Sequence, residues 1–341
     1  MKPIRVLGGG LAGQVCALLL AQKGYSVTLF EPQTEPQDKV CGEGILPIGV
    51  GVLTRLDPKR SWLPLGRAFS GITYQAGSKR AQAGFSGGEF GFGVSRLRLD
   101  AWLREQVAQQ PKITLNAKRV ELHDVLTDDI WACGLQSRLL RVGQPRRARR
   151  FGLRFRVLTD EVPRRVTVQF FAWGECYFTP IDDRTVSVAF LVHSNASKPK
   201  DFESHIRQML GPNCQIEKGE ARAPIAMAWY KRPNRVLLGD CYRAFDPISG
   251  AGMSFALLCA ELAAQSAGQL EAYQQAIFPV ERHFRRMTNL LLLLSGRPRL
   301  AQWVVGKMDR HPQAFASLLH AYNDVSGLGL SAGVQLARLL T

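Results

Sequence analysis

The pattern of apolar and polar residues begins with two short strands that flank a helix. An apolar run at residues 4–7 leads into a glycine-rich turn at residues 8–13, and an alanine- and leucine-rich segment spans residues 14–22. A second apolar run at residues 25–30 ends at Glu31. This order predicts a strand, a tight turn, a helix and a second strand with a carboxylate at its tip.

The rest of the chain shows three kinds of pattern. Helical spacing of apolar residues predicts helices at 49–56, 101–109, 202–209 and 254–267, and from 271 onward. Short apolar runs predict strands at 113–116, 119–122, 128–137 and 234–238. Alternating stretches predict glycine-rich hairpins over 69–92 and a separate antiparallel sheet over 151–192. That sheet would form a wall of a substrate chamber, with Phe170, Trp173, Tyr177 and Phe178 as its aromatic residues.

The first turn has the residues that a dinucleotide needs. Gly8 allows a sharp turn, Gly10 lets the backbone approach a pyrophosphate, and Gly13 lets the helix pack closely on the strand. The N–H groups around Leu11 and Ala12 would face the phosphates at the helix N-terminus. Glu31 would accept hydrogen bonds from ribose hydroxyls, and because it would repel a 2′-phosphate, the pattern favours FAD or NAD over NADP.

Two later segments also predict close backbone contact with a ligand. In the first, glycines flank an acid at residues 41–44, which suits either backbone folded around a flat group or a plain turn. In the second, an aspartate follows a strand and a glycine-rich helix start comes next, an arrangement suited to a phosphate or a flavin edge. The residues of this second segment are Gly239, Asp240, Pro247, Gly250, Ala251, Gly252 and Met253.

Composition narrows the partners. The formal net charge of +16 favours an anionic partner such as an acidic substrate, an acidic carrier or partner protein, or a membrane surface. The densest basic run, residues 146–150, lacks interleaved aromatics, so we expect no nucleic-acid partner. The 7 cysteines are scattered without a CxxC pair, and the histidines form no ligand cluster. We therefore expect no metal site and a reducing cytoplasm, with no secretory signal and no transmembrane segment but with peripheral membrane contact left open.

With these motifs, the chain resembles the FAD-dependent oxidoreductases of the para-hydroxybenzoate hydroxylase fold. Within that fold, it resembles the branch of geranylgeranyl reductase-like proteins and flavin-dependent halogenases. Four blocks carry the resemblance over residues 4–268: the glycine turn with Glu31, the 41–44 loop, Arg96 to Asp100, and the 239–253 segment. The resemblance implies that FAD is bound by residues of all four blocks: Gly8, Gly10, Leu11, Ala12, Gly13, Glu31, Cys41, Gly42, Gly44, Arg96, Gly239, Asp240, Pro247, Gly250, Ala251, Gly252 and Met253. It implies that Glu43 and Tyr177 are the candidates for a catalytic role, with a backbone-bracing role open for Glu43.

The expected fold is α/β. A Rossmann-type, glutathione-reductase-like FAD-binding domain would comprise residues 1–68, 94–150 and 230–270. An inserted antiparallel substrate domain would comprise residues 69–93 and 151–229, and a helical segment would follow over residues 271–341.

Three functions are compatible with these residues. The first is an FAD-dependent monooxygenase that hydroxylates an electron-rich, small or carrier-tethered substrate with O2 through a flavin C4a-hydroperoxide. The second is an FAD-dependent dehydrogenase or reductase of an alkene or isoprenoid-like substrate. The third is a non-catalytic flavoprotein in an assembly.

Departures from the family bear on the choice. Cys133-Gly134 stands where hydroxylases carry an Asp-Gly motif tied to nicotinamide use, so the donor is left as NAD(P)H or a separate reductase. The halogenase W-x-W-x-I-P motif is absent, and halogenation is not expected. Tyr177 and Pro180 resemble a remnant of the geranylgeranyl reductase motif.

Overall fold

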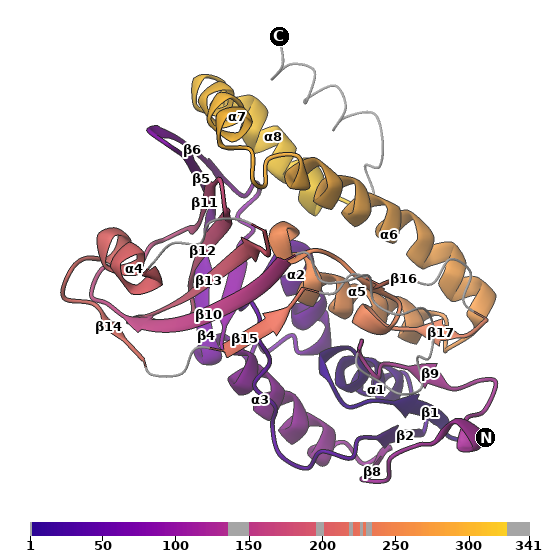
Figure 1. Cartoon of the computed structure of the whole chain (residues 1–341). Coiled ribbons are helices and arrows are strands. Elements are labelled where there is room, and N and C mark those ends of the chain that lie inside the picture. Colours follow the sequence, from indigo (N-terminus) through magenta and orange to yellow (C-terminus); the bar gives the residue numbers. More distant parts are fainter. Residues whose placement is uncertain are drawn as a thin grey trace.

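The computed structural model describes residues 2–135, 150–195, 201–217, 221–225, 228–229 and 234–325. In Figure 1 the chain forms two sheet-based regions, with the C-terminal helices α6 (Leu270–Leu292), α7 (Pro298–Arg310) and α8 (Pro312–Asn323) along one side. Most of the basic run at residues 146–150 lies outside the described residues; only its last member, Arg150, is described.

The first region is built on a five-stranded parallel sheet in the order β17-β9-β1-β2-β8. Its strands are β1 (Ile4–Leu7), β2 (Val27–Phe30), β8 (Ile113–Asn116), β9 (Ile130–Trp131) and β17 (Val236–Leu237). Helix α1 (Leu11–Gln22) is buried almost all round because α3 (Arg96–Gln109) and α5 (Gly252–Gln265) both pack on it. Close packing of helices on parallel strands gives the dinucleotide-binding fold that the sequence predicts.

The second region is an eight-stranded sheet in the order β14-β10-β13-β12-β11-β5-β6, with β15 also paired to β10. These strands are β5 (Gly71–Ala76), β6 (Lys79–Gly84), β10 (Arg150–Leu158), β11 (Val166–Phe171), β12 (Gly174–Pro180), β13 (Thr185–His193), β14 (Gln215–Ile216) and β15 (Ala221–Pro224). Pairing is antiparallel except between β11 and β5, which run parallel. The glycine-rich hairpin at β5–β6 therefore joins this sheet from a distant part of the chain.

Alternation along each strand sends side chains to two different cores. Cys176 and Phe178 of β12 face the core under α4 (Phe202–Leu210), whereas Tyr177 between them faces the core under α7 and α8. The period of two is why neighbouring aromatic residues of one strand serve different faces.

Smaller sheets, a further helix and one-turn helices complete the fold. A three-stranded antiparallel sheet is formed by β3 (Gly44–Ile45), β7 (Gly91–Val94) and β4 (Gly66–Phe69), and α2 (Pro47–Leu56) packs on α5. A further two-stranded pair joins β16 (Ala228–Trp229) to β18 (Arg243–Ala244). One-turn helices occur at Leu63–Leu65, Leu122–Asp124, Gly239–Cys241 and Pro247–Ser249.

Several sequence-based expectations are wrong in detail. Residues 119–122 form no strand, and α3 begins at Arg96 rather than at residue 101. The strand expected over 128–137 is limited to Ile130–Trp131, and residues 136–137 lie outside the described residues. Strand β9 is two residues long because only Ile130 and Trp131 pair with the neighbouring strands, β1 on one side and β17 on the other.

Within the described ranges, no helix is long and apolar enough to cross a bilayer. The same ranges hold no group of three or more His, Cys, Asp or Glu side chains arranged to bind a metal ion.

Candidate flavin and substrate site

A cavity of about 330 Å³ lies where the parallel sheet, the large sheet and the N-terminus of α5 meet. The turns after β1, β9 and β17 supply one side, and strands β5, β11, β12 and β13 supply the other. Of the predicted cofactor-binding residues, most line this cavity: Gly10, Leu11, Ala12, Cys41, Gly42, Gly44, Arg96, Gly239, Asp240, Pro247, Gly250, Gly252 and Met253. Both catalytic candidates, Glu43 and Tyr177, line it as well.

Gly8 and Gly13 do not line the cavity but build the turn that does. Gly8 has a φ of +110°, and a Cβ there would lie 2.5 Å from the carbonyl oxygen of Ala132. A Cβ on Gly13 would lie 1.8 Å from the carbonyl oxygen of Gly8. Only glycine lets α1 begin this close to β1.

Glu31 holds the start of the turn from the tip of β2. Its Oε2 accepts the N–H of Gly9 at 2.7 Å, and its Oε1 accepts the N–H of Gln33 at 2.8 Å. A carboxylate oxygen can accept more than one hydrogen bond, so Glu31 retains capacity for ribose hydroxyls.

The segment from Asp246 to Gly252 forms an open cradle. A Cβ added at Gly250 or Gly252 would meet no described heavy atom within 4 Å, so the backbone there is bare toward the cavity. Asp246 caps the turn by accepting the N–H of Ile248 at 3.0 Å, and Ala251 is fully buried behind it. The neighbouring wall carries Asp240, which is open to the cavity and whose pKa is raised because desolvation by the surrounding wall outweighs the opposing charges of Lys39 and Arg96.

Glu43 is fully buried in a positive-φ conformation, with a φ of 57°. Its Oε1 accepts hydrogen bonds from the backbone N–H of Arg96 at 3.0 Å, from Arg156 at 2.8 Å and from Arg154 at 3.3 Å. The two guanidinium groups also pair with Asp38, and although burial alone would raise the pKa of Asp38, they lower it. Because two arginines and a backbone N–H all bind the same carboxylate oxygen, the geometry favours a bracing role for Glu43.

Arg96 stands at the first turn of α3 and lines the cavity. Its Nη1 is buried and has no hydrogen-bond partner among the described residues. A buried guanidinium nitrogen without a partner is costly unless a ligand satisfies it, and its charge suits an anionic ligand.

The opposite wall is apolar. Ala189, Tyr177, Val168 and Tyr74 lie directly side by side across β13, β12, β11 and β5, and all four line the cavity. The Tyr177 hydroxyl donates to the carbonyl of Ile248 at 2.6 Å, and burial raises its pKa well above the usual value.

The structure corrects the expected aromatic wall. Phe178 belongs to the core on the other face of the sheet, and Trp173 stacks on Phe171 with ring centroids 4.5 Å apart in that same outer core. Phe170 shares a face with Tyr177 but packs against Tyr74 rather than lining the cavity. Tyr74 and Tyr322, which do line it, were missed by the sequence analysis because neither stands in a motif.

A buried ionic network behind the cradle was also missed. Arg150 donates to Asp246 at 2.6 Å and also binds Glu175, whose other oxygen accepts the Ser295 hydroxyl at 2.7 Å. Arg150 is the last residue of the basic run, where its sequence neighbours gave no sign of burial. The network ties the cradle to the large sheet and to the end of α6.

These features fit FAD. The bare backbone at Gly250 and Gly252 leaves room for a flat ligand, and a Cβ on Gly10 would contact only the end of the Lys39 side chain, at 3.9 Å. The unpartnered nitrogen of Arg96 can bind a phosphate oxygen. Glu31 lies where a ribose would be recognised. Gly10, Gly250, Gly252, Arg96 and Glu31 would therefore hold the cofactor.

Comparisons with known proteins agree with this architecture. Residues 6–37 match the model of the NAD(P)-binding Rossmann-like domain. The menaquinone reductase of Mycolicibacterium smegmatis is 26% identical over an alignment of 352 positions, which covers 87% of this chain and 85% of that protein.

Two solved structures are similar along nearly the whole chain. A probable FAD-dependent monooxygenase, PqsL from Pseudomonas aeruginosa, superposes with a TM-score of 0.68 at 17% identity, covering 89% of this chain and 98% of that one. A geranylgeranyl bacteriochlorophyll reductase-like protein from Thermoplasma acidophilum gives a TM-score of 0.66 at 16% identity, covering 98% and 95%.

The chain therefore has the fold of the flavin-dependent oxidoreductases, the fold shared by flavin-dependent monooxygenases, halogenases and geranylgeranyl reductase-like proteins. The predicted fold class and the predicted resemblance are confirmed.

Proposed function

We propose that the protein is an FAD-dependent reductase of an apolar, isoprenoid-like or quinone substrate. One observation carries this choice: the wall that faces the cradle carries no charged side chain. It is the row of Ala189, Tyr177, Val168 and Tyr74, whose methyl, isopropyl and ring surfaces are apolar. Such a wall favours an apolar substrate over an anionic one. The near full-length relative named menaquinone reductase supports the same substrate class.

Some residues of the site would bind the cofactor, and others would enclose the substrate. FAD, when bound, supplies two-electron redox chemistry. Arg96 and the backbone N–H groups at the starts of α1 and α5 would bind its charged parts. Tyr177 and Tyr322 donate to the carbonyls of Ile248 and Ser249, at 2.6 and 2.7 Å, and so would fix the cradle in place. The apolar row would exclude water from the substrate.

Tyr74 is the tyrosine best placed to give a proton to the substrate. It lines the cavity, and unlike Tyr177 and Tyr322 its hydroxyl makes no hydrogen bond to a described residue. Burial raises its pKa to about 12, so the phenol stays protonated at neutral pH. Reduction of a double bond consumes a proton as well as a hydride, and Tyr74 would supply that proton.

A monooxygenase that uses O2 on a small or carrier-tethered substrate is the second candidate, because the fold is shared with PqsL, a probable FAD-dependent monooxygenase. The electron donor, NAD(P)H or a separate reductase, belongs to either proposal. A non-catalytic flavoprotein would show no turnover with any donor.

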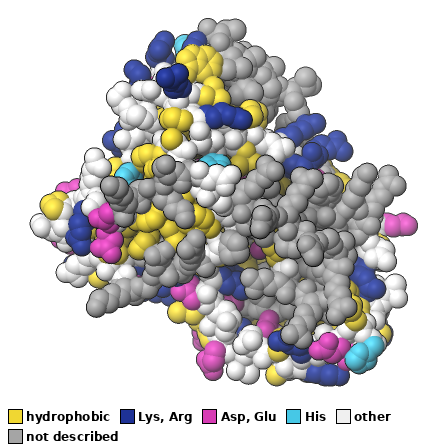
Figure 2. Space-filling model, in the orientation of Figure 1, with side chains coloured by type: hydrophobic (Ala, Val, Ile, Leu, Met, Phe, Trp, Pro, Cys, Tyr) yellow, Lys and Arg dark blue, Asp and Glu magenta, His cyan; other side chains and the backbone are white. Residues whose placement is uncertain are grey.

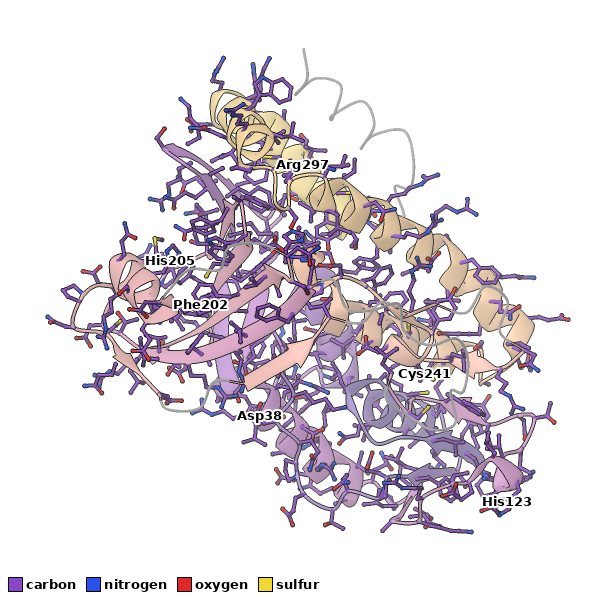
Figure 3. The ribbon with its side chains drawn as sticks, viewed as in Figure 1. Asp38, His123, Phe202, His205, Cys241 and Arg297 are labelled. Atoms are coloured by element: carbon purple, nitrogen blue, oxygen red, sulfur yellow. The ribbon has the colours of Figure 1, made fainter. Side chains whose placement is uncertain are left out.

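We further propose that the substrate is reached from a membrane surface. At the corner between α6 and α7, four apolar side chains are exposed between 37% and 50%: Leu290, Leu293, Leu300 and Trp303. Exposed Arg297 and Arg299 flank them, and the ammonium of Lys307 lies 5.8 Å from the centre of the Trp303 ring. Figure 2 shows basic beside hydrophobic side chains at the end of the molecule where α7 lies, and Figure 3 labels Arg297 at the corner.

The decisive experiment is anaerobic turnover of the FAD-loaded protein with a short-chain prenylated quinone, using NADPH, NADH or dithionite as donor. We expect product whose prenyl chain is heavier by two hydrogens, which distinguishes it from the quinol that the donor can form directly, and we expect Tyr74→Phe to lower kcat at least tenfold while FAD affinity stays unchanged. Tyr177→Phe is the matched control, which removes a hydroxyl from the same row and should weaken FAD binding instead. Oxygen-dependent product that carries label from ¹⁸O2 would overturn the reductase and establish the monooxygenase.

A further inference from the structure

Two thiols meet beside the candidate flavin site. The Sγ atoms of Cys133 and Cys241 lie 3.5 Å apart although the residues are 108 positions apart in sequence. Cys241 is fully buried and Cys133 is half-buried, so one member of the pair can be reached from solvent. Figure 3 labels Cys241 in the part of the molecule built on the parallel sheet.

Strand topology brings the pair together. Cys133 follows β9 and Cys241 ends the one-turn helix that follows β17, and these two strands are parallel neighbours. Parallel strands end at the same edge of a sheet, so the turns that follow them converge.

The residues next to the pair belong to the cavity wall. Ala132 and Gly134, the residues on either side of Cys133 in sequence, line the cavity, and so do Gly239 and Asp240, which directly precede Cys241. A displacement of the backbone at either cysteine therefore moves residues of the cavity wall that are one peptide bond away.

We propose that Cys133 and Cys241 form a reversible disulfide that controls the affinity of the protein for FAD. A peroxide oxidises the Cys133 thiol to a sulfenic acid and is reduced to water or an alcohol. The Cys241 thiol then displaces hydroxide from that sulfur, and the S–S bond forms with release of water. A small dithiol restores both thiols and leaves as its own disulfide. The proposal does not depend on which substrate the enzyme reduces.

The bond requires the two sulfurs to approach. A disulfide holds its sulfurs about 2 Å apart, so closure from 3.5 Å brings the two Sγ atoms about 1.5 Å closer. Because Cys241 is fully buried in packed surroundings, we expect the closure to shift the 132–134 turn as well as the Cys133 side chain. The cavity as it stands, with separate thiols, is the form that fits FAD. We therefore expect the oxidised protein to bind FAD several-fold more weakly than the reduced protein.

The test treats the apoprotein with stoichiometric hydrogen peroxide, then blocks remaining thiols and maps peptides without reduction. We expect a cross-linked peptide pair containing Cys133 and Cys241, a mass loss of two hydrogens, and a raised Kd for FAD by flavin fluorescence. Dithiothreitol should reverse all three. Cys133→Ser and Cys241→Ser should each abolish the cross-link, and Cys133→Ser should keep FAD affinity constant under peroxide.

Cys41→Ser is the matched control, because Cys41 is another half-buried thiol at the cavity. It should leave the cross-link intact. A disulfide that pairs Cys133 with any other cysteine, overoxidation of Cys133 without a cross-link, or an FAD Kd that is the same in both redox forms would each overturn the proposal. None of these readouts requires turnover, so failure here is distinct from failure of the proposed reductase.

Discussion

Glu43 illustrates how one side chain can look catalytic in sequence and structural in space. Its carboxylate is fully buried, and its Oε1 accepts hydrogen bonds from Arg154 and Arg156, which lie on the same face of strand β10. It also fixes the start of α3 through the N–H of Arg96, a residue of the cavity wall. The charge of Glu43 thereby holds the large sheet to the cofactor half of the molecule.

We expect Glu43→Gln to destabilise the protein by about 2–4 kcal/mol, because it removes the carboxylate charge that the buried Arg154 and the partly buried Arg156 share, and leaves Asp38 as their only other ionic partner among the described residues. The free energy of unfolding from denaturant titration measures this. Asp183→Asn is the control, since Asp183 pairs with Arg67 but its side chain is 98% exposed, and such a pair contributes about 0–1 kcal/mol. Equal small losses in the two variants would show that Glu43 does not brace the fold.

At the scale of elements, the cavity is built from the ends of helices and strands. At the cavity, α1 begins directly after Gly10, α5 begins with Gly252, and α3 begins with Arg96. The glycines at these starts have different roles. Gly13 makes room for packing inside the fold, whereas Gly252 leaves room for a ligand.

This difference predicts opposite outcomes for the same substitution. Gly13→Ala gains about 1 kcal/mol of helix propensity but places a methyl group 1.8 Å from a carbonyl oxygen, so the clash decides and both stability and FAD binding are lost. Gly252→Ala should keep or raise the melting temperature while it weakens FAD binding about tenfold or more, because its methyl group enters open space in the cavity.

Melting temperature and FAD titration of each variant separate the two effects. Gly84→Ala on β6 is the control, since its Cβ would make an ordinary contact at 3.5 Å. If Gly252→Ala bound FAD as tightly as the parent, the cradle at the start of α5 would not be a flavin site.

At the scale of the whole molecule, charge and exposed apolar surface act together. The net charge of +16 attracts the chain to anionic surfaces, and the corner between α6 and α7 offers apolar side chains that can enter a bilayer interface. Helices α7 and α8 also cover the face of the large sheet that lines the cavity. In the proposed membrane-bound orientation, the same helices would stand between the lipid surface and the site.

We expect co-sedimentation with phosphatidylglycerol vesicles, weak binding to phosphatidylcholine vesicles, and release at high salt. Trp303→Ser and the pair Arg297→Glu with Arg299→Glu should each reduce binding severalfold. Leu122→Ser and Lys59→Glu are controls, because Leu122 is 53% exposed and Lys59 is exposed in other parts of the molecule. Binding that these controls reduce as strongly would place the contact elsewhere or make it unspecific.

The sequence by itself determined the local half of this protein. The glycine turn, the acid at the tip of β2 and the cradle before α5 are short-range patterns, because turn geometry and helix starts depend on residues a few positions apart. Boundaries were less exact: α3 starts five residues early because Ser95 and Arg96 are fixed by the distant Glu43 and Arg156.

Only the tertiary structure decided which side chains share a surface. Tyr74 and Tyr177 become neighbours through the parallel pairing of β5 with β11, while Phe178, one residue from Tyr177, is turned to the other core. The buried Arg150 binds the carboxylates of Glu175 and Asp246, which lie 25 and 96 positions away in sequence. Cys133 and Cys241 meet although 108 positions separate them. Such contacts depend on strand order and register, which long-range packing sets and which no local pattern encodes.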